Sequence, residues 1–203
     1  MKKILLIICA LGVFTLSCMQ NKNGEFTKEE LSLIHSADSI MRVLVVTDSI
    51  DNQVLRAQST DLSETALLSE DYTRLCELML ATVTHPSQDG VGIAAPQVGL
   101  NRRVVAVMRF DKEDAPFEVY ANIRIIRRSE TTVTESEGCL SVPDLREDVV
   151  RSKDIDIEYI DMEQLKEGRY VTKRETIYGF SSVIFQHEVD HLEGIIYTDR
   201  VSK

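Results

Sequence analysis

Two histidines and a glutamate lie close together near the C-terminus, in the segment His187-Glu188-Val189-Asp190-His191. If this segment is helical, residues four apart share one face, so His187 and His191 can bind the same metal ion. Glu188 adjoins the first histidine and can take a proton from metal-bound water and return it to a leaving amine. A chance pattern on a solvated helix is the alternative interpretation. The segment predicts a metal-dependent hydrolytic site.

A second segment, EGCLS at 137–141, offers a third ligand. The thiolate of Cys139 is a strong metal ligand, and two histidines plus one cysteine leave a fourth position open for water. Gly138 permits close backbone approach, and the peptide N–H of Leu140 adjoins the ligand. Taken alone, Cys139 would be better explained as a structural thiol, or as one half of a disulfide with Cys76 in an oxidising compartment, than as a metal ligand.

A third segment, GVGIAAPQVG at 90–99, is a tight loop of small residues that another chain can approach. It lacks the Gly-Lys-Ser/Thr ending of a phosphate-binding loop, and its glycine spacing does not fit the dinucleotide fingerprint. The neutral amide of Gln97 suits a hydrogen bond to a developing oxyanion.

Taken together and in this order, GVGIAAPQ, EGCLS and QHEVDHLEG resemble the motifs of the peptide deformylase family, GxGxAAxQ, EGCxS and QHExDHxxG. The likeness extends from about residue 28 to the C-terminus. It implies a metal-dependent hydrolase that removes the N-formyl group from the N-terminal formyl-methionine of peptides or proteins and releases formate.

The resemblance also implies a metal site. Cys139, His187 and His191 would hold one divalent ion, which is Fe²⁺ in the family, with Ni²⁺, Co²⁺ or Zn²⁺ as possible substitutes. Ligand rules alone would have favoured zinc. Glu188 would serve first as general base and then as general acid.

Further roles concern the substrate. Gln97 and the backbone N–H of Leu140 would stabilise the oxyanion, and the peptide backbone would pair with the glycine-rich segment as an added strand. Arg146 is a further candidate at the mouth of the site. The residues expected to bind substrate are Val91, Gly92, Gly138, Val183 and Ile184, with His187 beside the methionine side chain.

The N-terminus has the pattern of an export signal. Lys2 and Lys3 precede 13 uncharged residues, 4–16, which are too few to cross a bilayer as a helix. Cys18 follows a small residue, as in bacterial lipoprotein signals, although an ordinary cleavable signal remains an alternative. We expect a signal peptide at 1–17, lipidation at Cys18, a tether at 18–27 and a catalytic domain at 28–203. The mature protein would then be anchored in the bacterial cell envelope, touching the membrane only through its lipid.

Composition supports one acidic domain. The 203 residues carry a net charge of −10, and without Lys2 and Lys3 the remainder carries −12. Such a surface argues against nucleic acid as a partner, because phosphate-backbone binding needs a basic patch. Four cysteines are too few for a disulfide scaffold.

The elements that position these motifs are predicted from periodicity and turn signals. We expect helices at 28–41 and 67–82, a loop at 48–60, and a last helix at 181–192 with Ser181 or Ser182 as N-cap and Gly194 as its stop. The predicted strands cover 43–46, 103–108, 117–126, 131–136, 155–159 and 170–177. This outline is an α+β fold, with mostly antiparallel short strands around a C-terminal metal-binding helix.

Some features depart from the family or stay open. The family often has Asn-Pro where this chain has Asn122-Ile123, and its ordinary members are not exported. An exported amidohydrolase acting on another acyl group and a non-catalytic formyl-peptide-binding lipoprotein are therefore alternatives. We expect Glu137 to support the site by accepting a hydrogen bond from Arg102 or Arg103.

Overall fold

The computed structural model describes residues 24–88 and 90–201. The predicted signal peptide and Cys18 lie outside these residues, as does 18–23 of the predicted tether. Residues 24–27 already pack on the domain: Gly24 O accepts a hydrogen bond from Ser63 N, and Thr27 caps the first helix. The packed chain thus begins before residue 28. No helix among the described residues is long and apolar enough to cross a membrane.

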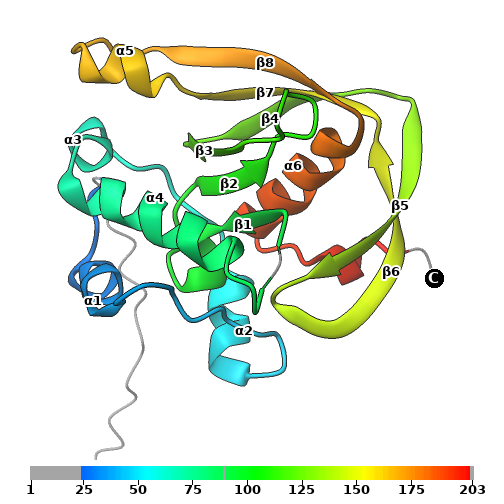
Figure 1. The fold of residues 1–203 in the computed structure, drawn as a ribbon, viewed down its shortest axis with the longest axis horizontal. Coiled ribbons are helices and arrows are strands. Elements are labelled where there is room, and N and C mark those ends of the chain that lie inside the picture. Colours follow the sequence, from blue (N-terminus) through cyan, green and yellow to red (C-terminus); the bar gives the residue numbers. More distant parts are fainter. Residues whose placement is uncertain (1–23, 89, 202–203) are drawn as a thin grey trace, which may run out of the picture.

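Three antiparallel sheets form the framework within the described residues (Figure 1). The first has the strand order β1-β2-β3, the second β4-β7-β8, and the third pairs β5 with β6. Their bounds are β1 Gly92–Ala94, β2 Val104–Met108, β3 Phe117–Ala121, β4 Arg124–Arg128, β5 Thr132–Cys139, β6 Val142–Ser152, β7 Asp154–Ile160 and β8 Thr172–Tyr178.

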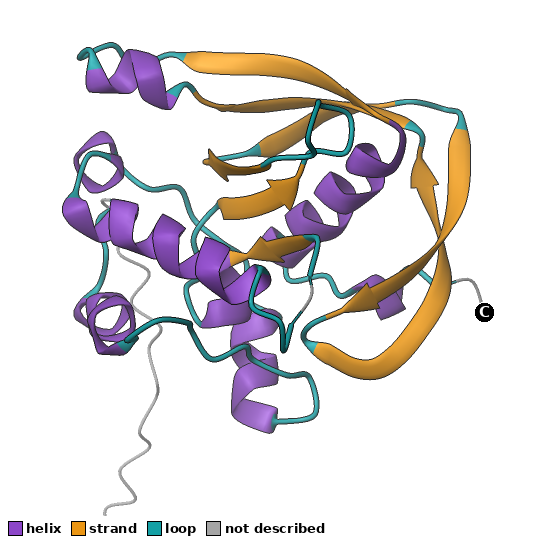
Figure 2. Ribbon diagram, in the orientation of Figure 1, coloured by secondary structure: helices purple, strands orange, loops and turns teal. Residues whose placement is uncertain are grey.

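Helix α6, Gly179–Leu192, runs through the middle of the molecule, with strands of all three sheets around it (Figure 2). Every residue from Ser181 to Leu192 is buried, so this helix has no solvated face. A helix buried on all sides belongs to the core. Any polar side chain that it carries must therefore find an internal partner or line a cavity.

The remaining helices lie mainly in the N-terminal half, and side chains cap the α-helices among them. Their bounds are α1 Lys28–Ser36, α2 Ser49–Leu55, α3 Glu64–Leu67, α4 Glu70–Val83, the 3-10 turn η1 Ala95–Val98, α5 Met162–Lys166 and the 3-10 turn η2 Tyr197–Asp199. Thr27 and Glu30 form a reciprocal capping box at α1, and Ser69 accepts from Tyr72 N at α4. Each such cap satisfies backbone N–H groups that have no partner within the helix.

Strand β2 joins the two main parts of the core because both of its faces are buried. Val104 and Ala106 pack in the cluster that contains α4, whereas Val105 and Val107 pack in the cluster that contains α6. Successive side chains of a strand point to opposite faces, so one strand can serve both layers. This packing holds α6 against β1 and β2 and thereby fixes the place of the HEVDH segment.

The structure confirms the α+β class and most predicted elements, and it corrects several details. The first helix ends at Ser36, well before residue 41. Residues 43–46 are not a strand, although Leu44 N and Val46 N donate to Gln97 O and Ser141 O. Residues 48–60 are not all loop, because Asp48 caps α2.

Further corrections concern where predicted strands and helices are interrupted and where the last helix begins. The single strand predicted at 117–126 is interrupted by Asn122, whose φ of 51° turns the chain into a second sheet. The helix predicted at 67–82 is divided at Ser69, which caps α4. The last helix starts at Gly179, with Tyr178 at the N-cap position and no side-chain cap, so Ser181 and Ser182 lie inside it. Strand β6 was not predicted at all.

Candidate active site

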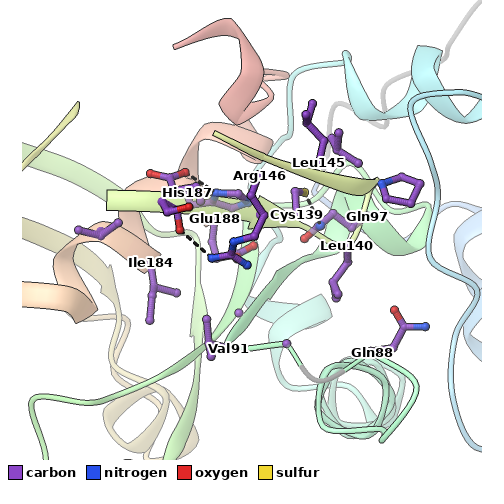
Figure 3. Close-up of a pocket in the computed structure, with 18 of the residues that line it drawn as sticks. Gln88, Val91, Gln97, Cys139, Leu140, Leu145, Arg146, Ile184, His187 and Glu188 are labelled. Atoms are coloured by element: carbon purple, nitrogen blue, oxygen red, sulfur yellow. Dashed lines mark hydrogen bonds and ion pairs between the residues drawn. The ribbon is translucent and has the colours of Figure 1, made fainter. Parts of the chain in front are cut away.

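Three ligand-type side chains meet at one point of the fold. Cys139 ends β5, and His187 and His191 lie one turn apart on α6. Figure 3 shows two of them, Cys139 and His187. One ligand atom from each lies within 4.8 Å of the other two, and Cys139 Sγ is 3.3 Å from Nε2 of His191. The sequence expectation that these three residues share a site agrees with this geometry.

The donor set fits a divalent transition metal. A thiolate with two imidazoles suits zinc, iron, cobalt or nickel, and leaves room for substrate or water at the ion. Nδ1 of His187 pairs with Glu137 Oε2 at 2.8 Å, which leaves Nε2 as the ring nitrogen for a metal. Burial holds the pKa of His191 well below its usual range, so this imidazole is neutral, as a ligand must be.

Glu188 directs a carboxyl group into the same space (Figure 3). The residue is only 4% exposed, and its Oε2 is buried with no hydrogen-bond partner among the described residues. Burial raises the pKa of this carboxyl to about 7. A buried carboxyl without a partner is costly unless something else completes it. Its position beside the three ligands is that of a group that exchanges a proton at neutral pH.

Gln97 is oriented by its own backbone neighbours. Its Oε1 accepts from Ala94 N at 2.8 Å, which turns the Nε2 donor toward Cys139 Sγ at 3.5 Å and Ser141 Oγ at 3.3 Å. The side chain is buried in η1, so the amide has little freedom to turn. Leu140 follows Cys139 directly and lines the same cavity. The arrangement places donors where negative charge can develop.

A buried ionic chain supports the metal ligands from behind. Arg151 of β6 donates from Nε and Nη2 to both oxygens of Glu137, at 2.7 and 2.9 Å, and from Nη1 to Asp190. Burial would raise the pKa of Glu137, but the hydrogen bonds from Arg151 and His187 outweigh it and lower the pKa to about 2. Arg200 also donates to Asp190 at 2.6 Å. Glu137 thus remains an anion that orients His187.

The partner predicted for Glu137 was wrong. Arg102 pairs with Glu30 and Arg103 with Glu193, and both arginines are buried away from Glu137. Arg151, the true partner, lies opposite Val133 in the β5–β6 ribbon, and no motif marks it in the sequence. The alternative of a disulfide between Cys139 and Cys76 is also wrong, since both thiols are free.

A cavity of about 740 Å³ opens over the ligands. All five predicted substrate residues line it: Val91, Gly92, Gly138, Val183 and Ile184. The sequence analysis missed Phe180 and Leu145, which also line it and are 46% and 40% exposed. Phe180 precedes Ile184 by one helical turn, a spacing that would have shown that they share a face.

Comparisons of sequence and of structure both match this chain to peptide deformylases. The family model described as polypeptide deformylase matches residues 43–203. A peptide deformylase of Leptospira biflexa is 35% identical over 159 residues, covering 75% of this chain and 84% of that protein. The crystal structure of peptide deformylase from Thermotoga maritima matches with a TM-score of 0.68 and 30% identity, covering 82% of this chain and 100% of that one. A class I type b peptide deformylase from Acinetobacter baumannii with bound Met-Ala-Ser matches with a TM-score of 0.68 and 32% identity, covering 80% and 98%.

Proposed function

The chain belongs to the polypeptide deformylase family, and on that premise we propose how its own residues divide the work. It is a metal-dependent hydrolase that removes the N-formyl group from the N-terminal formyl-methionine of peptides or proteins and releases formate. We assign the metal to Cys139, His187 and His191, and proton transfer to Glu188. The observation that carries this assignment is the buried Oε2 of Glu188, which has no hydrogen-bond partner among residues 24–88 and 90–201, beside three converging ligand atoms.

When bound, the divalent ion supplies Lewis acidity that lowers the pKa of water and polarises a carbonyl. Glu188 takes a proton from the attacking water as the water oxygen adds to the formyl carbon. The carbon–nitrogen bond then breaks, and Glu188 returns the proton to the departing nitrogen. The products are formate and a free amine, so every atom of the water is accounted for.

Gln97 and Leu140 are the proposed oxyanion donors. The Gln97 amide is held by Ala94 N, so its Nε2 donor is oriented before substrate arrives. Donors that are fixed in advance stabilise developing charge without having to reorganise. The Leu140 N–H would act from the residue after Cys139.

The substrate backbone would lie along β1, which is an edge strand of its sheet. An extended peptide can add to such an edge through backbone hydrogen bonds. Its methionine side chain would enter the apolar part of the cavity formed by Val91, Val183 and Ile184. Gly92 and Gly138 would contact the peptide with backbone only.

Glu188→Ala and Glu188→Gln test the assignment of the general base. Both variants are expected to fold and keep metal but to lose about 10²- to 10⁴-fold in turnover of a formyl-Met peptide. Cys139→Ala serves as the contrasting control, because it should lose metal together with activity. Near-normal formate release by either Glu188 variant would exclude the proposed role. Release of a different acyl group instead of formate would point to the alternative amidohydrolase.

We propose Fe²⁺ as the working metal, with Ni²⁺ or Co²⁺ as active substitutes and Zn²⁺ as a weaker one. A thiolate with two imidazoles accepts all four ions. The test is anaerobic preparation of metal-free protein, loading with each ion and measurement of formate release. Iron should be the most active and should lose activity in air, since oxygen can reach an Fe²⁺–thiolate centre through the cavity and oxidise it. Equal activity with zinc would contradict this assignment.

We also propose that the protein is exported and held in the bacterial cell envelope by a lipid on Cys18, with residues 1–17 removed. The basic start, the short apolar run at 4–16 and the following cysteine support this. Its substrates would then be formylated peptides or protein N-termini met outside the cytosol. Mass spectrometry of the mature N-terminus would show a lipidated Cys18, and Cys18→Ser should release the protein from membranes, whereas Cys76→Ser should not. An unprocessed N-terminus would contradict export.

A further inference from the structure

One cation stands out in the cavity, and the function proposed above does not use it. Among the described residues that line the cavity, Arg146 is the only lysine or arginine. It is an exposed residue of β6, and Figure 3 shows its side chain reaching across the space between Cys139 and Ile184. The chain as a whole is acidic, with 33 Asp and Glu against 23 Lys and Arg. A lone cation at the substrate cavity of an acidic protein therefore calls for an explanation.

The guanidinium of Arg146 is held in place by one hydrogen bond, and most of its N–H donors have no partner among the described residues. Its Nη2 donates to Ser136 O at 2.7 Å, and no carboxylate of the described residues pairs with it. Most other described arginines do have an acidic partner, as Arg151 does with Glu137. A guanidinium offers five N–H donors in a planar fork that fits a carboxylate. Most of that fork is left for a ligand.

The β5–β6 register fixes where the fork lies. Gly138 and Arg146 are cross-strand partners, and a side chain at 138 would come within 3.0 Å of Arg146 Nη1. The absence of a side chain at Gly138 therefore leaves room for the guanidinium. Gly138 directly precedes the ligand Cys139, so the fork is on the order of 10 Å or less from the reacting centre, given about 3.8 Å between neighbouring Cα atoms.

Other charges in the cavity narrow the choice of ligand. The carboxylates that line it are Glu137, Asp144 and Glu188, and both oxygens of Glu137 are already occupied by Arg151. These groups disfavour an anion in most of the cavity, so apart from the metal site, which the formyl group would occupy, only the neighbourhood of Arg146 favours one. An extended residue spans about 3.3–3.6 Å, which places the C-terminal carboxylate of a two- or three-residue peptide roughly 7–11 Å from its formyl group. A peptide of this size is therefore long enough to reach the fork.

We infer that Arg146 binds the C-terminal carboxylate of a short formyl-peptide, so that the preferred substrates are released formyl-peptides of two or three residues. This inference rests on the proposed function and specifies its substrate class. Arg146 acts as a specificity residue and takes no part in bond breaking. An internal peptide bond presents no charge at this position, so a long chain gains nothing from the fork.

The test compares formyl-Met-Ala-Ser as free acid with the same peptide as C-terminal amide, using metal-loaded enzyme. We expect kcat/KM to favour the acid by about threefold to tenfold, the range for a charge-assisted contact that is partly open to solvent. In Arg146→Ala this ratio should fall to about one through loss on the acid alone. Arg128→Ala is the matched control, since Arg128 is exposed on β4 and lies outside the cavity. Raising salt from 0.05 to 0.5 M should shrink the wild-type ratio.

Binding separates this inference from the proposed function. Titration calorimetry with unformylated Met-Ala-Ser, as acid and as amide, measures the same preference without any turnover. A ratio near one in the wild type, or an unchanged ratio in Arg146→Ala, would overturn the role of Arg146 while formate release continues. Absence of formate release from every peptide, with the acid still bound more tightly than the amide, would overturn the proposed function and leave the carboxylate site standing.

Discussion

Replacement of Gly92 by alanine should disturb Glu188 without touching any metal ligand. Gly92 lies in β1, directly beside the Glu188 side chain. A Cβ at this position would lie 2.5 Å from Glu188 Oε1 and 2.9 Å from its Cδ and Cγ. Ordinary non-bonded contacts between such atoms begin near 3.5 Å. The carboxyl must therefore move by roughly 1 Å, or β1 must yield by the same amount.

The magnitude differs between stability and catalysis. Overpacking of a buried site costs about 1–3 kcal/mol. Alanine also restricts the unfolded chain, which returns about 0.4–1 kcal/mol to the folded state. The net loss in free energy of unfolding should then lie between about 0 and 2.6 kcal/mol. Catalysis is more sensitive, because displacement of a reacting group by about 1 Å costs on the order of 10²-fold in kcat.

The assay measures formate release, bound metal and urea unfolding on the same preparations of wild type and Gly92→Ala. Gly168→Ala is the matched control, since Gly168 has a φ of +79° and nothing within 4 Å of an added Cβ. Alanine in that conformation costs about 1–2 kcal/mol from backbone strain alone. The control should lose similar stability and keep its kcat. A Gly92→Ala enzyme with full metal content and a kcat within threefold of wild type would refute the reasoning.

Two further predictions concern buried titratable groups. Arg151→Ala leaves Glu137 and Asp190 buried without their shared partner. The free energy of unfolding measured in urea should therefore fall by about 3–5 kcal/mol. A loss below about 1 kcal/mol would show that the ionic network contributes little to stability. Burial raises the pKa of Cys76 to about 11, above that of an unfolded thiol near 8.5, so its contribution to stability is complete below about pH 8.5 and is lost as pH rises through 11. The free energy of unfolding should therefore decrease more between pH 8 and pH 10.5 in the wild type than in Cys76→Ala. Equal decreases in the two proteins would contradict the assignment.

Much of the chemistry could be predicted because it depends on residues that are close in the chain. His187 and His191 share a helical face through their spacing alone, Glu188 adjoins the first of them, and the order of the three motifs indicated the family. Strands with clear alternation, such as Ile155, Ile157 and Tyr159, were likewise found from local pattern. At these positions the repeat of the helix or strand backbone is enough to predict which side chains lie together.

Other features were misjudged because local signals were weak or misleading. The polar stretch at 48–60 contains α2 because Asp48 caps it and Leu55 is buried in the core. A capping aspartate is as common in turns as in helices, so its meaning depends on what the next residues can pack against. The break at Asn122 is stabilised by two hydrogen bonds with Leu62, which is sixty positions away in the chain.

The arrangement around the site depended entirely on tertiary structure. Arg151 reaches Glu137 and Asp190 because β6 pairs with β5 and packs against α6, and no spacing in the sequence encodes that approach. The same pairing places Arg146 over Gly138 and inside the cavity. Sequence spacing thus established which residues can bind a metal and move a proton, because helical geometry is local. Which groups orient those residues, and which cation lines the cavity, was decided by strand register, since register brings together residues that have no fixed distance along the chain.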